Sequence, residues 1–268
     1  MRVAGLQCDL AWEDPAANRA RLGPRIEDAA RAGARLVVLP EMWPTGFSMD
    51  AERVAEDEGG PSEAFLVERA RATGAAVGGS VAQRTAAAAR GAKPRNVFVL
   101  ALPDGTVHRY AKIHPFTYGG ETQHFDAGTD AVTVTWDGVR ITPLVCYDLR
   151  FPELFAAVAA RTDLFVVVAS WPVARVANWT ALLTARAIET QAYVLGVNRV
   201  GSGGGLAYSG ASRLVSPTGA LLDGDVAADG AERVVAGEVD PAEVASLRAK
   251  FPFLADRRPD VYRRIRGD

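Results

Sequence analysis

Apolar residues along this 268-residue chain gather in short runs, and longer segments with helix signals separate these runs. Residues 34–39 form a largely apolar run of the kind that a sheet buries on both faces. The segment 15–32 follows Asp14-Pro15, an N-cap with proline at the first helical position, and Gly33 ends it. Because strand-like and helix-like segments alternate along most of the chain, the pattern predicts an α/β protein with helices covering mixed sheets.

The same reading divides the chain into elements. Expected strands are residues 3–8, 34–39, 75–82, 96–102, 106–112, 131–136, 139–146, 164–170, 193–199, 212–215, 220–223 and 232–238. Expected helices are residues 15–32, 61–73, 152–160, 176–190 and 241–251. Two low-complexity patches, 86–89 and 201–205, are expected to be loops. With no linker and no repeat, residues 1–268 are expected to form a single domain with a C-terminal tail from about residue 252.

Composition narrows the class of partner. The net charge of -2 and the absence of a basic tract argue against nucleic acid as a partner. Two cysteines and three histidines make neither a disulfide framework nor a structural zinc site. No leader and no apolar run of about 20 residues is evident, so no membrane association is expected. We therefore expect a cytoplasmic protein whose thiols stay reduced.

Cys146 is the first candidate for chemistry. It ends the strand 139–146 and precedes a helix near Pro152, a position at the carboxyl end of the sheet, where α/β proteins bind ligands. The helix N-terminus favours a thiolate there, and its backbone N–H groups can hold an oxyanion. The alternative is a small buried side chain, as is expected of Cys8.

Two charged residues at other strand ends can complete a site around this sulfur. Glu41 follows a buried strand and precedes a stiff aromatic loop, residues 42–47, which would desolvate the carboxylate as a general base requires. Lys112 ends the strand 106–112 beside another aromatic loop, where its ammonium can stabilise anions. Both could instead be solvated surface residues. No histidine has an obvious partner position, so a cysteine–glutamate–lysine set is preferred over a cysteine–histidine pair.

Three segments resemble, in the same order, the signature motifs of the nitrilase (carbon–nitrogen hydrolase) superfamily. They are Leu39-Pro40-Glu41, Tyr110-Ala111-Lys112-Ile113-His114 and residues 144–153. The similarity continues through residues 185–189, 196–201 and 208–212, so it covers nearly the whole chain. Residues 41–47, 146–152 and 169–175 are similar to the ω-amidase-like branch, although Ser170 stands where an asparagine is expected.

The resemblance implies an α-β-β-α sandwich of two mixed sheets with helices outside, no metal, no organic cofactor, and a homodimer or higher homo-oligomer. It implies that Glu41 takes the thiol proton as Cys146 attacks an amide carbon. Lys112 and the backbone N–H of Tyr147 would hold the oxyanion, ammonia would leave, and water activated by Glu41 would hydrolyse the thioester. Glu121 matches a second glutamate that positions the substrate amide or Lys112.

The ω-amidase-like branch acts on the terminal amide of short α-keto acid amides such as α-ketoglutaramate and α-ketosuccinamate. Arg175 is the expected partner of the substrate carboxylate, because a guanidinium fork suits it. The candidate pocket walls are aromatic: Phe47, Phe116, Tyr118 and Trp171. The same three catalytic residues would also serve an N-carbamoyl amino acid hydrolase or a nitrilase, and a non-catalytic binding protein on this fold is a remote alternative.

Overall fold

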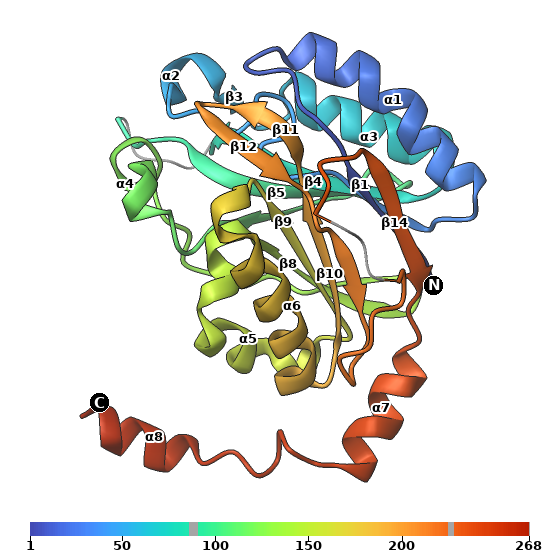
Figure 1. Cartoon of the computed structure of the whole chain (residues 1–268), viewed down its shortest axis with the longest axis vertical. Helices are drawn as coiled ribbons and strands as arrows, with labels where there is room; N and C mark the ends of the chain where they lie inside the picture. Colours follow the sequence, from blue (N-terminus) through green and yellow to red (C-terminus); the bar gives the residue numbers. More distant parts are fainter. Residues whose placement is uncertain (86–90, 225–227, 268) are drawn as a thin grey trace.

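Two β-sheets lie face to face with helices on both outer sides in the computed structural model, which describes residues 1–85, 91–224 and 228–267 (Figure 1). The first sheet has the order β14-β1-β2-β4-β5-β6, with β3 paired to β4. The second has the order β13-β10-β9-β8-β7. Helices α1 and α3 cover the first sheet, and α5 and α6 cover the second (Figure 1). The α-β-β-α sandwich with two mixed sheets is therefore confirmed.

Each sheet has a parallel centre and antiparallel edges. In the first sheet β1, β2 and β4 run parallel, while β14, β5 and β6 pair antiparallel. In the second sheet β8, β9 and β10 run parallel, flanked by antiparallel β7 and β13. The strands of the first sheet are β1 Arg2–Gln7, β2 Leu36–Val38, β3 Glu56–Asp57, β4 Ala76–Arg84, β5 Arg95–Ala101, β6 Val107–Ala111 and β14 Arg233–Glu238. Those of the second are β7 Val134–Trp136, β8 Val139–Val145, β9 Leu164–Ala169, β10 Tyr193–Asn198 and β13 Arg213–Val215.

The helices begin where the sequence places their caps. The Asp14 carboxylate accepts the Ala17 N–H at 3.0 Å, and α1 starts at the adjacent proline. Gly74 ends α3 in the left-handed conformation at φ +71°. The helices are α1 Pro15–Arg31, α2 Ala51–Val54, α3 Pro61–Thr73, α4 Glu121–His124, α5 Pro152–Val158, α6 Val176–Thr190, α7 Pro241–Lys250 and α8 Pro259–Arg266. Within the described ranges, none of them is both long and apolar enough to cross a bilayer.

The main core lies between the sheets. Side chains from β2 and β5 meet side chains from β8, β9 and β10 there, and burial of each large aliphatic one contributes about 1.5–3 kcal/mol. The backbones approach closely at Gly5 of β1, where a Cβ would stand 2.6 Å from the Cγ2 of Val197. The sheets are thus in direct contact and fix the relative positions of residues that follow their strands.

Two expectations about strands and loops need correction. Residues 201–205 are not a simple loop, because β11 Val200–Gly203 and β12 Leu206–Ser209 form a separate two-stranded hairpin. Residues 220–223 form no strand; Leu221 makes only an isolated bridge to Val215. The C-terminal tail contains α8, which extends away from the sandwich (Figure 1). The expected loop at 86–89 lies outside the described residues.

Candidate active site

The three candidate catalytic residues meet at one edge of the sandwich. Glu41 lies three residues beyond β2, and Lys112 directly follows β6, so both come from the first sheet. Cys146 directly follows β8 of the second sheet, and Ser170 directly follows β9. The predicted strand ends therefore converge as expected, and the site is built from both sheets.

A buried ion cluster holds the first-sheet residues together. The Lys112 ammonium lies 3.0 Å from Glu41 Oε1 and 2.7 Å from Glu121 Oε2. The Asn96 amide donates to both carboxylates, at 2.9 Å to Glu41 and 3.2 Å to Glu121. All four side chains are at most 1% exposed. Since buried charges are costly unless paired, the surface-residue alternatives for Glu41 and Lys112 are wrong.

Glu41 also reaches across to the second sheet. Its Oε2 accepts the Ser170 N–H at 2.8 Å. The adjacent Trp171 is fixed by Asn198, whose Oδ1 accepts the Trp171 N–H at 2.7 Å and whose amide donates to the Trp171 carbonyl at 3.0 Å. One carboxylate therefore bridges the two sheets, and a buried asparagine holds the loop that receives it.

The Cys146 backbone adopts an unusual conformation, with φ at +47°. A non-glycine residue held there costs roughly 1–3 kcal/mol and needs support from its surroundings. The buried Asp148 carboxylate supplies it by accepting from the Val145 N–H at 3.0 Å, the Tyr110 hydroxyl at 2.8 Å and the His114 N–H at 3.0 Å. The His114 Nδ1 lies 2.9 Å from the same carboxylate. His114 thus supports the turn and does not partner the sulfur.

The electrostatics of the sulfur differ from the expectation. Burial raises the pKa of the Cys146 thiol well above its ordinary value, the Glu41 carboxylate raises it further, and Lys112 only partly opposes them. The expectation of a favoured thiolate is therefore wrong for the resting site, because burial and the neighbouring carboxylate outweigh the ammonium. A protonated thiol needs a base before it can attack, and Glu41 stands beside it.

Lys112 and Glu121 stabilise each other's charged forms. Burial opposes the charge of Lys112, but the carboxylates of Glu121 and Glu41 keep its pKa above the ordinary value. Burial raises the pKa of Glu121, and the Lys112 ammonium opposes this shift. Lys112 therefore remains an ammonium at any working pH and can stabilise negative charge that develops nearby.

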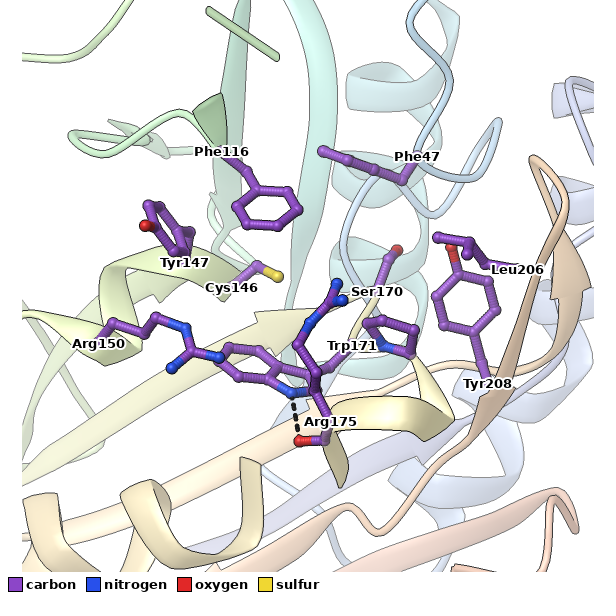
Figure 2. A pocket seen from close by; sticks show the side chains of 11 residues that line it. Phe47, Phe116, Cys146, Tyr147, Arg150, Ser170, Trp171, Arg175, Leu206 and Tyr208 are labelled. Atoms are coloured by element: carbon purple, nitrogen blue, oxygen red, sulfur yellow. Dashed lines mark hydrogen bonds between the residues drawn. The ribbon is translucent and has the colours of Figure 1, made fainter. Parts of the chain in front are cut away.

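Cys146 opens into a cavity that encloses about 420 Å³ of empty space, part of it at the open mouth (Figure 2). Of the lining residues, the sequence pointed to Phe47, Phe116, Cys146, Tyr147, Trp171 and Arg175. It missed Arg150, Ser170, Pro172, Leu206 and Tyr208. The expectation for Tyr118 is wrong: its side chain is 87% exposed and contacts the ring of Phe116 from outside the cavity.

Two arginines give the cavity a positive character. The Arg175 guanidinium extends into it, 5.6 Å from the ring centre of Phe116 (Figure 2). The Arg150 guanidinium lies 4.9 Å from the ring centre of Trp171. Within the part of the chain that the structure describes, neither arginine pairs with a carboxylate. The same ranges contain no cluster of His, Cys, Asp and Glu side chains that could hold a metal ion.

Comparison with known proteins identifies the family. Residues 2–249 match the carbon–nitrogen hydrolase family. The chain is 40% identical to the omega-amidase YafV of Escherichia coli K12 over 96% of both chains. It is 31% identical to the 2-oxoglutaramate amidase of Bacillus subtilis over 97% of this chain and 98% of the relative.

A solved structure agrees with these relatives. XC1258 from Xanthomonas campestris, a CN-hydrolase superfamily protein with an arsenic adduct in its active site, superposes with a TM-score of 0.88. It is 38% identical and covers 96% of this chain and 97% of its own. These matches confirm the resemblance seen in the three motifs. The chain therefore belongs to the carbon–nitrogen hydrolase (nitrilase) family.

Proposed function

We propose that this protein is an ω-amidase, a cysteine-dependent amidohydrolase that releases ammonia from the terminal amide of a short α-keto acid amide such as α-ketoglutaramate. The observation that carries the proposal is the buried cluster of Glu41, Lys112 and Glu121 behind a cavity lined by Cys146 and by Arg175, which has no carboxylate partner among the described residues. The names of the two amidase relatives support the substrate class.

Acylation begins with proton transfer from the thiol. Glu41 takes the proton of Cys146 as the sulfur attacks the amide carbon, and the carbonyl π electrons move to oxygen. The Lys112 ammonium and the backbone N–H of Tyr147 stabilise this oxyanion. Glu121 holds Lys112 in place through its 2.7 Å contact. Preorganised donors of this kind need little rearrangement as the charge develops, and that lowers the barrier.

Loss of ammonia completes acylation, and hydrolysis of the thioester then follows. Protonated Glu41 gives its proton to the leaving nitrogen, the carbon–nitrogen bond breaks, and ammonia departs from a thioester. Glu41 then takes a proton from water, whose oxygen attacks the thioester carbon. The carbon–sulfur bond breaks, the sulfur recovers its proton, and the acid is released. The sum is amide plus water giving acid plus ammonia, with no redox step.

The far end of the substrate carries a carboxylate, and we assign it to Arg175. Its guanidinium extends into the cavity without a carboxylate partner in the described ranges and can bind a carboxylate through two parallel hydrogen bonds (Figure 2). The aromatic rings of Phe47, Phe116 and Trp171 exclude water around the chain that joins the two ends. A short acyl chain places the amide at the sulfur and the carboxylate at the arginine.

We further propose that the chain works as a single-domain homodimer or larger homo-oligomer in the cytoplasm. Exposed apolar side chains near the C-terminal end, Phe251, Phe253, Tyr262 and Ile265, support association because water disfavours them. A free catalytic thiol also suits a reducing compartment. Light scattering coupled to size-exclusion chromatography measures the oligomer, and a monomer at micromolar concentration would refute this part.

Ammonia release from α-ketoglutaramate tests the activity. The native protein should release ammonia and the Cys146→Ala variant should release none above background. Substitution of the exposed Tyr118 by phenylalanine should leave the rate unchanged and serves as a control. A native protein that releases carbon dioxide with ammonia from N-carbamoyl amino acids, or that hydrolyses a nitrile, while sparing α-ketoglutaramate would overturn the substrate class and keep the chemistry.

A further inference from the structure

One polar side chain that lines the cavity has no role in the chemistry above. Tyr208 belongs to β12 of the hairpin and is 5% exposed, and its ring lines the cavity beside Leu206 (Figure 2). Its hydroxyl has no hydrogen-bond partner among residues 1–85, 91–224 and 228–267. The residue lines the cavity, so its hydroxyl is free to bond a partner that arrives with the substrate.

The buried Arg199 packs against the ring of Tyr208 and holds it in place. The Arg199 guanidinium lies 4.7 Å from its ring centre in a cation–π contact. Arg199 is fully buried, and its Nη2 donates to Asp9 Oδ1 at 2.9 Å and to the Ser202 carbonyl at 2.9 Å. These bonds also tie the hairpin to the first sheet. The ring therefore lines the cavity from a rigid support, so little entropy is lost when its hydroxyl binds a partner.

The phenol is also in the right state to donate. Burial raises the pKa of Tyr208 to about 12, against a lowering effect of Arg199, so the group is neutral at physiological pH. Tyr208 lines the same cavity as Cys146 and Arg175. A neutral phenol donates a hydrogen bond to a carbonyl oxygen.

We propose that the Tyr208 hydroxyl donates to the α-keto oxygen of the substrate, next to the carboxylate held by Arg175, and thereby sets a preference for α-keto acid amides. This inference rests on the proposed function and names the residue behind its substrate class. A substrate without the keto oxygen cannot make this hydrogen bond, which weakens binding in the transition state as well. An α-ammonium group, as in glutamine, meets Arg175 and Arg150 and is repelled.

The test compares two amides that differ only at the keto group. Native protein and Tyr208→Phe are assayed for ammonia release from α-ketoglutaramate and from glutaramate, the monoamide of glutaric acid. The phenylalanine ring keeps the contact with Arg199 and removes only the oxygen. We expect the native kcat/KM to be at least tenfold higher for the keto substrate. In Tyr208→Phe this ratio should fall about tenfold, the usual effect of one lost hydrogen bond. Tyr118→Phe, the matched change outside the cavity, should keep the native ratio.

Each result separates the inference from the proposed function. A native preference that Tyr208→Phe retains, or an equal loss on both substrates, overturns the role of Tyr208 and leaves the ω-amidase proposal intact. If the native protein has nearly the same kcat/KM for both amides, the role of Tyr208 is refuted without any variant. The test therefore does not depend on whether Tyr208→Phe folds. A native protein that hydrolyses neither compound refutes the proposed function, and this inference falls with it.

Discussion

Replacing Lys112 by methionine tests the buried ion cluster most directly. Methionine has a similar length and fills the space, but it removes the ammonium that lies 3.0 Å from Glu41 and 2.7 Å from Glu121. At an effective dielectric constant of about 20, each attraction is worth about 5–6 kcal/mol. The cost of removing the ammonium from water cancels much of this sum. Loss of one partner from a buried ion pair lowers the free energy of unfolding by about 3–5 kcal/mol, which we expect here.

The loss should also depend on pH. Without the ammonium, Glu121 keeps its burial and loses the charge that opposes its pKa shift, so its pKa in the folded variant lies above that in the unfolded chain. The folded state then binds a proton at Glu121 more tightly, and stability is retained at low pH and lost as pH rises through the folded pKa of Glu121. Burial already raises the pKa of Glu121 in the native protein, so the variant should show the same trend more strongly.

Urea denaturation at pH 5.5 and pH 8 measures both effects. The gap between native and Lys112→Met should be wider at pH 8, and Lys112→Met combined with Glu121→Gln should recover stability without recovering ammonia release. Lys250→Met, on the surface of α7, should change the free energy of unfolding by less than about 0.5 kcal/mol. A Lys112→Met variant that is within 1 kcal/mol of native at both pH values would refute the account of the cluster.

Three further predictions concern the sulfur, its turn and the anion site. Glu41→Gln should lower the rate of ammonia release by about 10²–10⁴-fold. It should also shift the alkylation of Cys146 by iodoacetamide to lower pH, because the Glu41 carboxylate raises the pKa of this thiol. Mass spectrometry measures the labelling, and an unshifted pH profile would contradict this account of the thiol pKa. Asp148→Ala should lower the free energy of unfolding by about 3 kcal/mol and kcat by more than tenfold, since three donors lose their acceptor; near-native kcat would show that the Cys146 turn needs no such support. Arg175→Met should raise KM for α-ketoglutaramate at least tenfold and leave a neutral short amide almost unaffected; equal losses on both substrates would argue against a carboxylate site.

Local pattern predicted the elements and the main catalytic residues for a physical reason. Glu41, Lys112 and Cys146 lie within three residues of the ends of β2, β6 and β8, and the carboxyl ends of parallel strands in a sheet meet at one edge. Asn96 gave no such signal, because a polar residue at the start of an apolar strand is common. Its importance appears only when β5 places it between two carboxylates.

The cavity walls were harder to predict, since tertiary contacts place them. The glycine-rich segment 201–205 lacks the alternation of a strand, so the hairpin that brings Tyr208 to the cavity was not expected. Tyr118 has the aromatic character of a pocket wall, yet the tight turn Thr117–Gly119 directs it to solvent. The ionisation of Cys146 could not be read from its position after a strand either, because burial and the Glu41 carboxylate decide it.

The division of the site between two sheets has a consequence for how the enzyme fails. Glu41 and Lys112 belong to the first sheet and Cys146 to the second, and the hydrogen bond from the Ser170 N–H to Glu41 joins the two sheets. A solvent or mutation that lets the layers slide by an ångström would silence turnover while circular dichroism still reported intact strands and helices. Activity is therefore more sensitive to the relative position of the two sheets than any spectrum of secondary structure. In a chain whose sheets are not yet packed together, the Cys146 thiol has no base beside it and stays unreactive.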